Sequence, residues 1–305
     1  MKSLITSLKR GVLATGLLAL ATPLAHAQTD LLGQLEQQTK QDEPTQLVEA
    51  TFKSTRLING QTVQTPGEGT MIFLISHRFG ALNSGAYEFF GLDKATLRLG
   101  FEYGLTDRLE VGVGRSSVEK TFDGFVKYKA VQQSTGAHAV PVSISLLGTA
   151  AISTFRYTDG LSRSVSDRTA YVYQALIARK FNTDFSLQLM PSLVHRNMVI
   201  TDYGEKNDVF ALGAGARYKL TRRFSLNGEY YYRLGGFNRD RYYNSVALGV
   251  DIETGGHVFQ LHITNSQAMI EPQFIAQTNG NVGAGDLFFG FNMSRNFTIK
   301  QRHRR

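Results

Sequence analysis

The sequence of 305 residues contains no cysteine and no tryptophan, and it has only 6 prolines. Without cysteine the chain has no disulfides and no metal site built on thiolate ligands. After position 27 no apolar run reaches the ~20 residues that a membrane-spanning helix needs. The formal net charge of +8 is a modest surplus. No basic cluster is interleaved with aromatic residues, so nucleic acid is not an expected partner.

The N-terminus has the features of a secretory signal peptide. Three basic residues precede an apolar stretch at positions 11–20, and Ala25-His26-Ala27 is a cleavage site of the small-x-small type. The apolar stretch is about half the length that a spanning helix requires. We therefore predict export, with cleavage after Ala27.

Glycine and aromatic residues are abundant, with 30 glycines, 20 phenylalanines and 13 tyrosines. In the stretch LRLGFEYGLTDRLEVGV (97–113), apolar residues alternate with charged residues and glycine on both sides of a polar turn. A period of two predicts a β-hairpin with one apolar and one polar face. The charged face cannot form a buried apolar core, so we expect lipid to cover the opposite face.

The same alternation recurs along the chain and predicts a transmembrane antiparallel up-and-down β-barrel. We expect about twelve strands, near 70–79, 93–104, 107–116, 121–133, 140–155, 169–181, 184–197, 207–220, 222–234, 241–253, 256–266 and 285–299. Most connections after even-numbered strands are short and most others are long, which is the pattern of outer-membrane barrels. The predicted localisation is the cell outer membrane.

Charged residues fall repeatedly on the face opposite the apolar one. An Arg or Lys on the lipid face at mid-depth costs about 2–4 kcal/mol, so we predict that the charged face points into the lumen. The lumen-facing candidates are Arg98, Glu102, Glu110, Arg217, Glu229, Arg233 and Asp251.

Two segments flank the predicted barrel of residues 70–305. We expect residues 28–69 to form a periplasmic N-terminal arm, in which 28–49 is a linker or a plug for the channel mouth. Within this arm, Thr51–Ile58 is β-prone and Asn59-Gly60 is a turn signal. The end of the barrel carries a basic tail, which is either solvated or in contact with acidic lipid headgroups.

Several short stretches, in order, carry a resemblance to a known family. They are TFKSTRLING (51–60), SHRFG (76–80), FFGLD (89–93), RLGFEYG (98–104), GVGRSS (112–117) and KTFDG (120–124). The sequence resembles a Bacteroidetes family of outer-membrane β-barrel proteins of unknown function, most strongly between Glu49 and Lys129. The resemblance implies an outer-membrane barrel and no assigned activity, substrate or catalytic residue. The tail 301–305 departs from barrels that end on an aromatic residue.

No motif in the chain predicts a catalytic or metal site. His77 and Arg78 end the first strand and form a candidate contact for an anionic ligand, or an interfacial strand end. Three further histidines, His195, His257 and His262, lie in predicted strands without metal-ligand spacing. Ser117 and Lys120 match a Ser-x-x-Lys string, but this nucleophile pair works from a helix and here lies in a loop.

Three functions remain open at this point, and no cofactor is predicted. The first is a narrow pore for small polar solutes, lined by the inward Arg and Glu residues. The second is a closed structural barrel that binds a partner, such as a periplasmic protein, through its loops or N-terminal arm. The third is a lipid hydrolase with a Ser–His pair, although we expect no enzyme. Outer-membrane lipid and the barrel-assembly machinery are expected partners in every case.

Overall fold

The computed structural model describes residues 44–199, 204–235 and 241–300. The predicted signal peptide, residues 28–43 of the predicted arm and the tail 301–305 lie outside these residues. The chain divides into two compact units. In the smaller unit, β1 (Gln46–Leu47) pairs antiparallel with β6 (Ser134–Thr135). The larger unit contains the barrel and is described by itself below.

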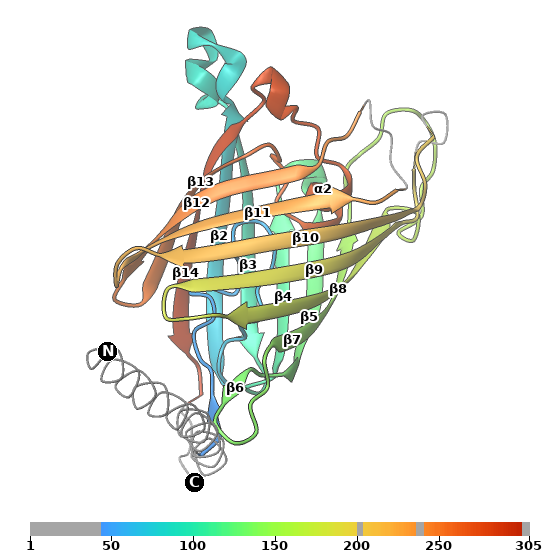
Figure 1. Ribbon diagram of the computed structural model, residues 1–305. Helices are drawn as coiled ribbons and strands as arrows, with labels where there is room; N and C mark the ends of the chain where they lie inside the picture. The colour runs from blue at the N-terminus through green and yellow to red at the C-terminus, as the bar shows by residue number, and fades with distance from the viewer. Residues whose placement is uncertain (1–43, 200–203, 236–240, 301–305) are drawn as a thin grey trace, which may run out of the picture. The chain divides into compact units, whose positions relative to one another are not determined.

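Twelve antiparallel strands close into one barrel, which confirms the predicted fold class and strand number (Figure 1). The strands are β2 (Thr70–Ala81), β3 (Ala95–Gly104), β4 (Leu109–Ser116), β5 (Phe122–Val131), β7 (Ser143–Ile152), β8 (Thr169–Lys180), β9 (Phe185–Arg196), β10 (Asp208–Lys219), β11 (Phe224–Arg233), β12 (Ser245–Thr254), β13 (His257–Thr264) and β14 (Phe288–Thr298). Each strand pairs with its neighbour along the chain, and β14 closes the ring against β2.

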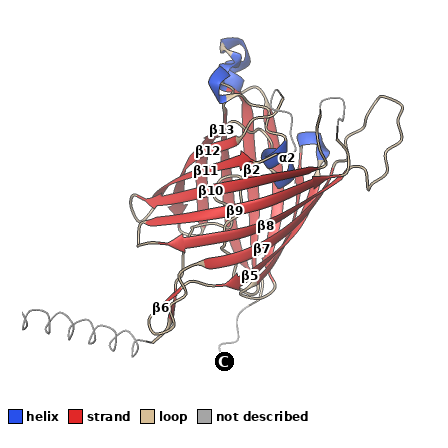
Figure 2. Ribbon diagram, turned by 45° about the vertical axis from the view of Figure 1, so that its right-hand side comes forward, coloured by secondary structure: helices blue, strands red, loops and turns tan. Residues whose placement is uncertain are grey.

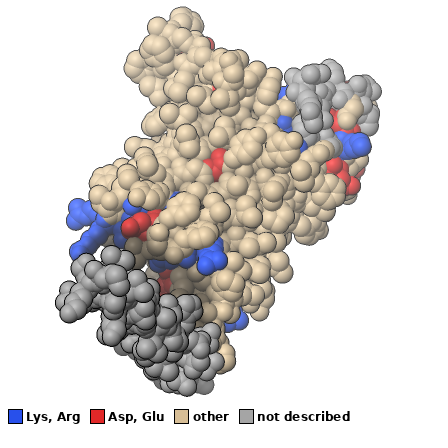
Figure 3. Space-filling view, in the orientation of Figure 1, with Lys and Arg blue, Asp and Glu red and all other residues tan. Residues whose placement is uncertain are grey.

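Alternation of side chains between two environments explains why these segments form strands. In β3, Leu99 is 41% exposed on the outside, whereas the neighbouring Arg98 is 1% exposed on the inside. A broad part of the outer surface carries no charged side chains (Figure 3). A surface of this kind is energetically acceptable where lipid covers it. Among the described residues, no helix is long and apolar enough to cross a membrane.

The two ends of the barrel differ in their connections. At one end, here called the turn end, short links such as Thr221–Arg223 and Gly255–Gly256 join consecutive strands. At the other, the loop end, the connection between β2 and β3 contains two short 3-10 helices, η1 (Leu82–Ser84) and η2 (Ala86–Gly91), which project beyond the strands (Figure 2). The chain enters β2 from the turn end, so the segment before β2 reaches the barrel from that side.

Residues Thr51–Val63, here called the lumen segment, lie inside the ring of strands (Figure 1). Most of them are buried, and they form a small hairpin in which the amide of Leu57 donates to the carbonyl of Gly60 over 2.8 Å. The prediction that residues 28–69 form a periplasmic arm is therefore wrong for this part of the chain. The physical reason is that the segment offers polar groups to the inward side chains of the barrel, which are buried.

A second segment closes the barrel from the loop end. The connection between β13 and β14 contains α2 (Glu271–Ala276), and all six of its residues are buried. It packs against β8, β9 and β11. Apolar residues of both closing segments, including Phe52, Leu57 and Phe274, join inward residues of the wall in one buried cluster. The interior is therefore a packed core with a polar half, rather than an open passage.

Candidate functional site

Glu229 of β11 holds the turn of the lumen segment. Its carboxylate accepts hydrogen bonds from the backbone amides of Ile58, Asn59 and Gly60, over 3.3, 2.9 and 3.1 Å. Three amide donors provide strong stabilisation for a buried carboxylate, because hydrogen bonds to an ionised acceptor are the stronger kind. The Asn59-Gly60 turn that the sequence predicts is thus present, and it is seated on a charge of the barrel wall.

Gly60 is required at this turn by close approach. A Cβ atom at position 60 would lie 2.2 Å from the hydroxyl oxygen of Tyr231 and 3.4 Å from Oε2 of Glu229. No side chain fits in that space, so only glycine lets the backbone reach the carboxylate. The hydroxyl of Tyr231, which is fully buried, in turn donates to the sulfur of Met190 at 3.1 Å.

Arg56 connects the lumen segment to both the wall and α2. Its Nη1 lies 2.7 Å from Oε1 of Glu271, and its Nε lies 3.5 Å from Oε1 of Glu102 on β3. Burial opposes the charge of this guanidinium, but the carboxylates of Glu271 and Glu102 outweigh it and raise the pKa of Arg56 above its ordinary value. The arginine therefore stays charged, and both closing segments depend on one buried cluster of charges.

Further polar contacts fix the lumen segment all round the ring. Lys127 of β5 donates to Gln61 over 3.0 Å, and Arg78 of β2 donates to Asn59 over 2.7 Å. Four more strands contribute through Ser145 on β7, Gln188 on β9, Gln260 on β13 and Asn292 on β14. Because the partners come from every side, the segment is enclosed by the barrel and not attached to one face of it.

The structure buries all seven lumen-facing candidates inside the barrel, but each of them binds another group of the protein rather than lining a passage. Glu102 and Glu229 bind the lumen segment, and Arg233 donates to the carbonyl of Ala276 at the end of α2 over 3.2 Å. The others bind wall residues: Arg98 to Asp123, Glu110 to Lys127, Arg217 to Ser225 and Asp251 to Gln260.

The residues missed in the sequence are the partners of these charges. Asp123 lies 2.5 Å from Arg98 and Lys127 lies 2.9 Å from Glu110, and all four side chains are almost fully buried. Both missed residues lie on the inward face of β5, which Asp123, Phe125 and Lys127 share. The alternation of Asp123 and Lys127 could have indicated a polar face, but the apolar Phe125 between them made this face look mixed.

The candidate anion contact of His77 and Arg78 is wrong, because neighbouring residues of a strand point to opposite faces. Arg78 is buried in the lumen, whereas the ring of His77 stacks outside on Phe291 at 5.0 Å between centroids. Near the loop end, both ring nitrogens of His195 are engaged, by Asp208 at 2.7 Å and Asn197 at 3.0 Å. In the residues that the structure describes, no group of three or more acidic or histidine side chains could hold a metal ion.

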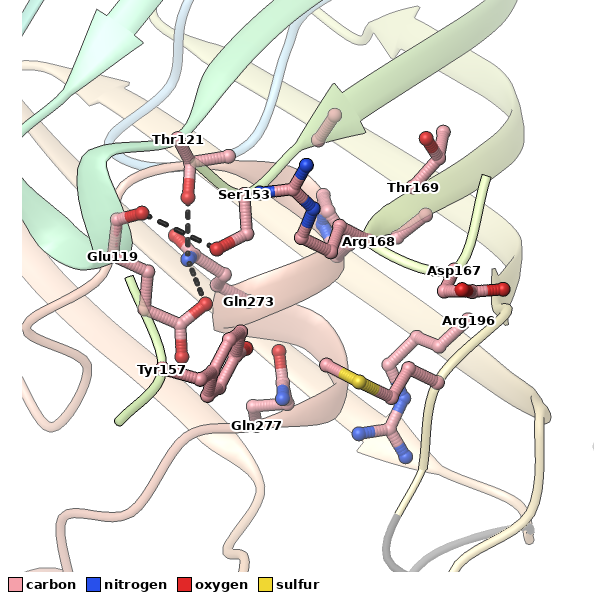
Figure 4. Close-up of a pocket in the computed structure, with 14 residues that line it drawn as sticks. Glu119, Thr121, Ser153, Tyr157, Asp167, Arg168, Thr169, Arg196, Gln273 and Gln277 are labelled. Atoms are coloured by element: carbon pink, nitrogen blue, oxygen red, sulfur yellow. Dashed lines mark hydrogen bonds between the residues drawn. The ribbon is translucent and has the colours of Figure 1, made fainter. Parts of the chain in front are cut away.

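A small pocket of about 100 Å³ opens at the loop end of the barrel (Figure 4). It lies between the start of β5, the connection from β7 to β8, the end of β9 and α2. Glu119 and Arg196 stand on opposite sides, with Gln273 and Gln277 between them (Figure 4). Arg168 completes the charged lining. This volume is below the range of about 300–1,000 Å³ that is usual for drug-sized ligands, so the pocket suits only a very small molecule.

Comparison with solved structures finds porins and other outer-membrane barrels at low sequence identity. The NanC porin is 9% identical with a TM-score of 0.48, and the match covers 76% of this chain and 100% of the porin. An outer membrane channel from Pseudomonas putida F1 is 15% identical with a TM-score of 0.46, over 76% of this chain and 96% of the channel. Outer membrane phospholipase A from Escherichia coli is 11% identical with a TM-score of 0.41, over 74% and 89%.

No functionally curated protein matches this sequence. A family model does match it, over residues 52–297. That range begins in the lumen segment and ends in the last strand, so it includes the closing segments together with the barrel wall. By this match, the chain belongs to the family described as a membrane bound beta barrel domain (DUF5777).

Proposed function

We propose that this protein is a gated pore for small polar solutes, and that the described conformation is its closed state. The observation that carries the proposal is the way the lumen is filled. Eight-stranded barrels are filled by their own side chains, whereas wider ones leave space inside. Here a twelve-strand ring is closed by two segments that are not strands of the ring, the lumen segment and α2.

The contacts of the lumen segment support a reversible closure. They are largely hydrogen bonds and ion pairs to wall groups, such as Glu229 and Lys127, that water can solvate once the segment leaves. The vacated wall would present Arg98 with Asp123 and Lys127 with Glu110 in neutralising pairs. We therefore expect weak discrimination between cations and anions in the open state.

Single-channel conductance in planar lipid bilayers tests this proposal. We expect the unchanged protein to be closed for most of the time, and a variant lacking residues 51–63 to conduct continuously. Glu229→Gln removes the charge that holds three amides, so it should open more often. Bilayers that stay sealed for both variants at every voltage, with folded barrel present, would overturn the proposal.

A reversible cross-link separates movement of the segment from a change in the wall. The hydroxyl of Ser145 donates to the carbonyl of Val63 over 3.2 Å, which places the two backbones close together. The chain has no cysteine of its own, so Val63→Cys with Ser145→Cys offers a single pair. In the Glu229→Gln background, oxidation should suppress the openings and reduction should restore them. The Val63→Cys single variant is the matched control.

One observation favours the alternative of a closed barrel that acts through its loops. The loop between β2 and β3 presents an aromatic tip, in which Tyr87 is 94% exposed and Phe89 and Phe90 are also exposed. Phe89 and Phe90 have φ angles of +46° and +54°, a conformation that costs free energy and concentrates at functional sites. If the bilayers in the conductance experiment stay sealed, this aromatic tip is the surface to test for binding of a partner.

A further inference from the structure

The residues that line the pocket at the loop end include polar groups without hydrogen-bond partners among the described residues. Gln273 is 5% exposed, and its Nε2 donates to Glu119 and Thr121 over 3.3 Å each, but its Oε1 accepts no hydrogen bond. Arg196 is 4% exposed, and its Nε has no acceptor although Nη1 donates to Glu205. A buried acceptor and a buried donor without partners are unusual in a folded protein, and both lie in residues that line this pocket.

The same pocket carries charges of both signs that the described chain does not pair. The one hydrogen bond that Arg168 makes there runs from its Nε to the carbonyl of Ser164 over 3.3 Å, so both terminal nitrogens are left for a ligand. Glu119 accepts from Gln273, and no cation of the described chain lies within ion-pair distance of it. Asp167 at the rim stays ionised, because hydrogen bonds from Ser164 lower the pKa of its carboxyl.

The backbone holds Glu119 in place at some cost. Glu119 and Lys120 both have positive φ angles, +49° and +51°, although neither is glycine. Two hydroxyls of the β7 end fix this turn: Ser153 donates to the carbonyl of Glu119 over 3.2 Å, and Thr154 to that of Lys120 over 2.6 Å. A strained turn that is fixed by neighbours in this way presents its side chain in one orientation.

We infer that this pocket binds a small zwitterion, a free α-amino acid. A carboxylate fits the two terminal nitrogens of Arg168, since a guanidinium binds carboxylates through paired N–H groups. An ammonium donates to the carboxylate of Glu119. The apolar part of the lining, from Ala151, Ala170, Pro272 and Met198, accommodates an aliphatic side chain. The site is lined in part by α2, so it needs α2 in place but uses no residue of the lumen segment.

Isothermal titration of the full chain in detergent micelles tests the inference, with L-leucine as the probe. We expect saturable binding of L-leucine, and binding at least tenfold weaker for N-acetyl-L-leucine and for L-leucinamide, which each lack one charge. Glu119→Gln should remove the preference over N-acetyl-L-leucine, and Arg168→Gln the preference over L-leucinamide. Each variant thus has its own signature, which general destabilisation would not produce.

Matched controls lie at the same end of the barrel but outside the pocket. Glu88 and Lys94 form an ion pair in the loop between β2 and β3 at 3.3 Å, so Glu88→Gln and Lys94→Gln remove the same charges without touching the lining. Both should bind L-leucine as the unchanged protein does. Equal binding of L-leucine and its two analogues, tighter binding of D-glucose, or no saturable binding of L-leucine would overturn the inference.

Discussion

Nη1 of Arg56 lies 2.7 Å from Oε1 of Glu271, and this contact joins two segments that are 215 residues apart in the sequence. Arg56 enters the barrel with the lumen segment from the turn end, and Glu271 begins α2 on the loop side. Both side chains are almost fully buried. The two closures of the barrel are therefore one electrostatic unit, and neither can leave without exposing or stranding a charge of the other.

A double-mutant cycle on this pair should reveal strong coupling. Glu271→Gln leaves the Arg56 charge with fewer acceptors in a buried site, and we expect a loss of about 3–5 kcal/mol in the free energy of unfolding, as for other broken buried pairs. Arg56→Gln should cost a similar amount. The double variant should lose less than the sum of the two, measured by urea unfolding in lipid vesicles. Strict additivity would contradict the proposed unit.

Gly60→Ala should loosen the lumen segment and cost about 1–3 kcal/mol, the usual penalty for overpacking. The added methyl group meets the hydroxyl of Tyr231 at 2.2 Å, whereas the next atom of that ring lies at 3.3 Å. Tyr231→Phe in the same chain should therefore restore much of the loss. Amide hydrogen exchange at residues 58–60 measures the effect directly, and an unchanged exchange rate in Gly60→Ala would count against the enclosed turn.

Lys127→Met should destabilise the protein by about 3–5 kcal/mol, because it leaves the buried carboxylate of Glu110 without its cation. Adding Glu110→Leu removes the stranded charge and should recover most of the stability. Urea unfolding in vesicles measures both variants. A double variant no more stable than Lys127→Met would indicate that the Lys127 contact with Gln61 dominates instead.

The lipid-facing surface can be tested with two leucines of nearly equal exposure. Leu248 on β12 is 67% exposed, and Leu161 in the connection between β7 and β8 is 69% exposed. Leu248→Arg should cost about 2–4 kcal/mol if lipid covers that face at mid-depth. Leu161→Arg should change stability by less than about 0.5 kcal/mol, as for most surface sites. Equal effects in vesicles would contradict the assigned membrane face.

The barrel wall could be predicted from the sequence because a period of two is a local signal. All twelve predicted strands overlap the observed ones, and the alternation around Arg98 and Leu99 separates inside from outside as expected. The membrane-bound β-barrel and the membership in a family of such barrels are confirmed. The bacterial group named with that family stays a prediction.

The closed lumen could not be predicted, because it depends on contacts between distant residues. Thr51–Val63 has the local features of a strand and a turn, and nothing in those features shows that Glu229 binds the turn from 170 residues away. The ion-pair partner of Arg98 could not be predicted from the sequence either. Glu102 lies on the same strand, but cross-strand geometry selects Asp123, two strands away around the ring.

The position of the lumen segment along the chain has a consequence for assembly. Thr51–Val63 precedes every barrel strand that it touches, from Arg78 on β2 to Asn292 on β14. The segment therefore comes before the first hairpin in the chain. The inward polar groups of each strand can hydrogen-bond to it as the barrel forms. A ring that closed without the segment would leave those groups to water. The segment therefore need not thread into a finished ring, because the strands that bind it can close around it.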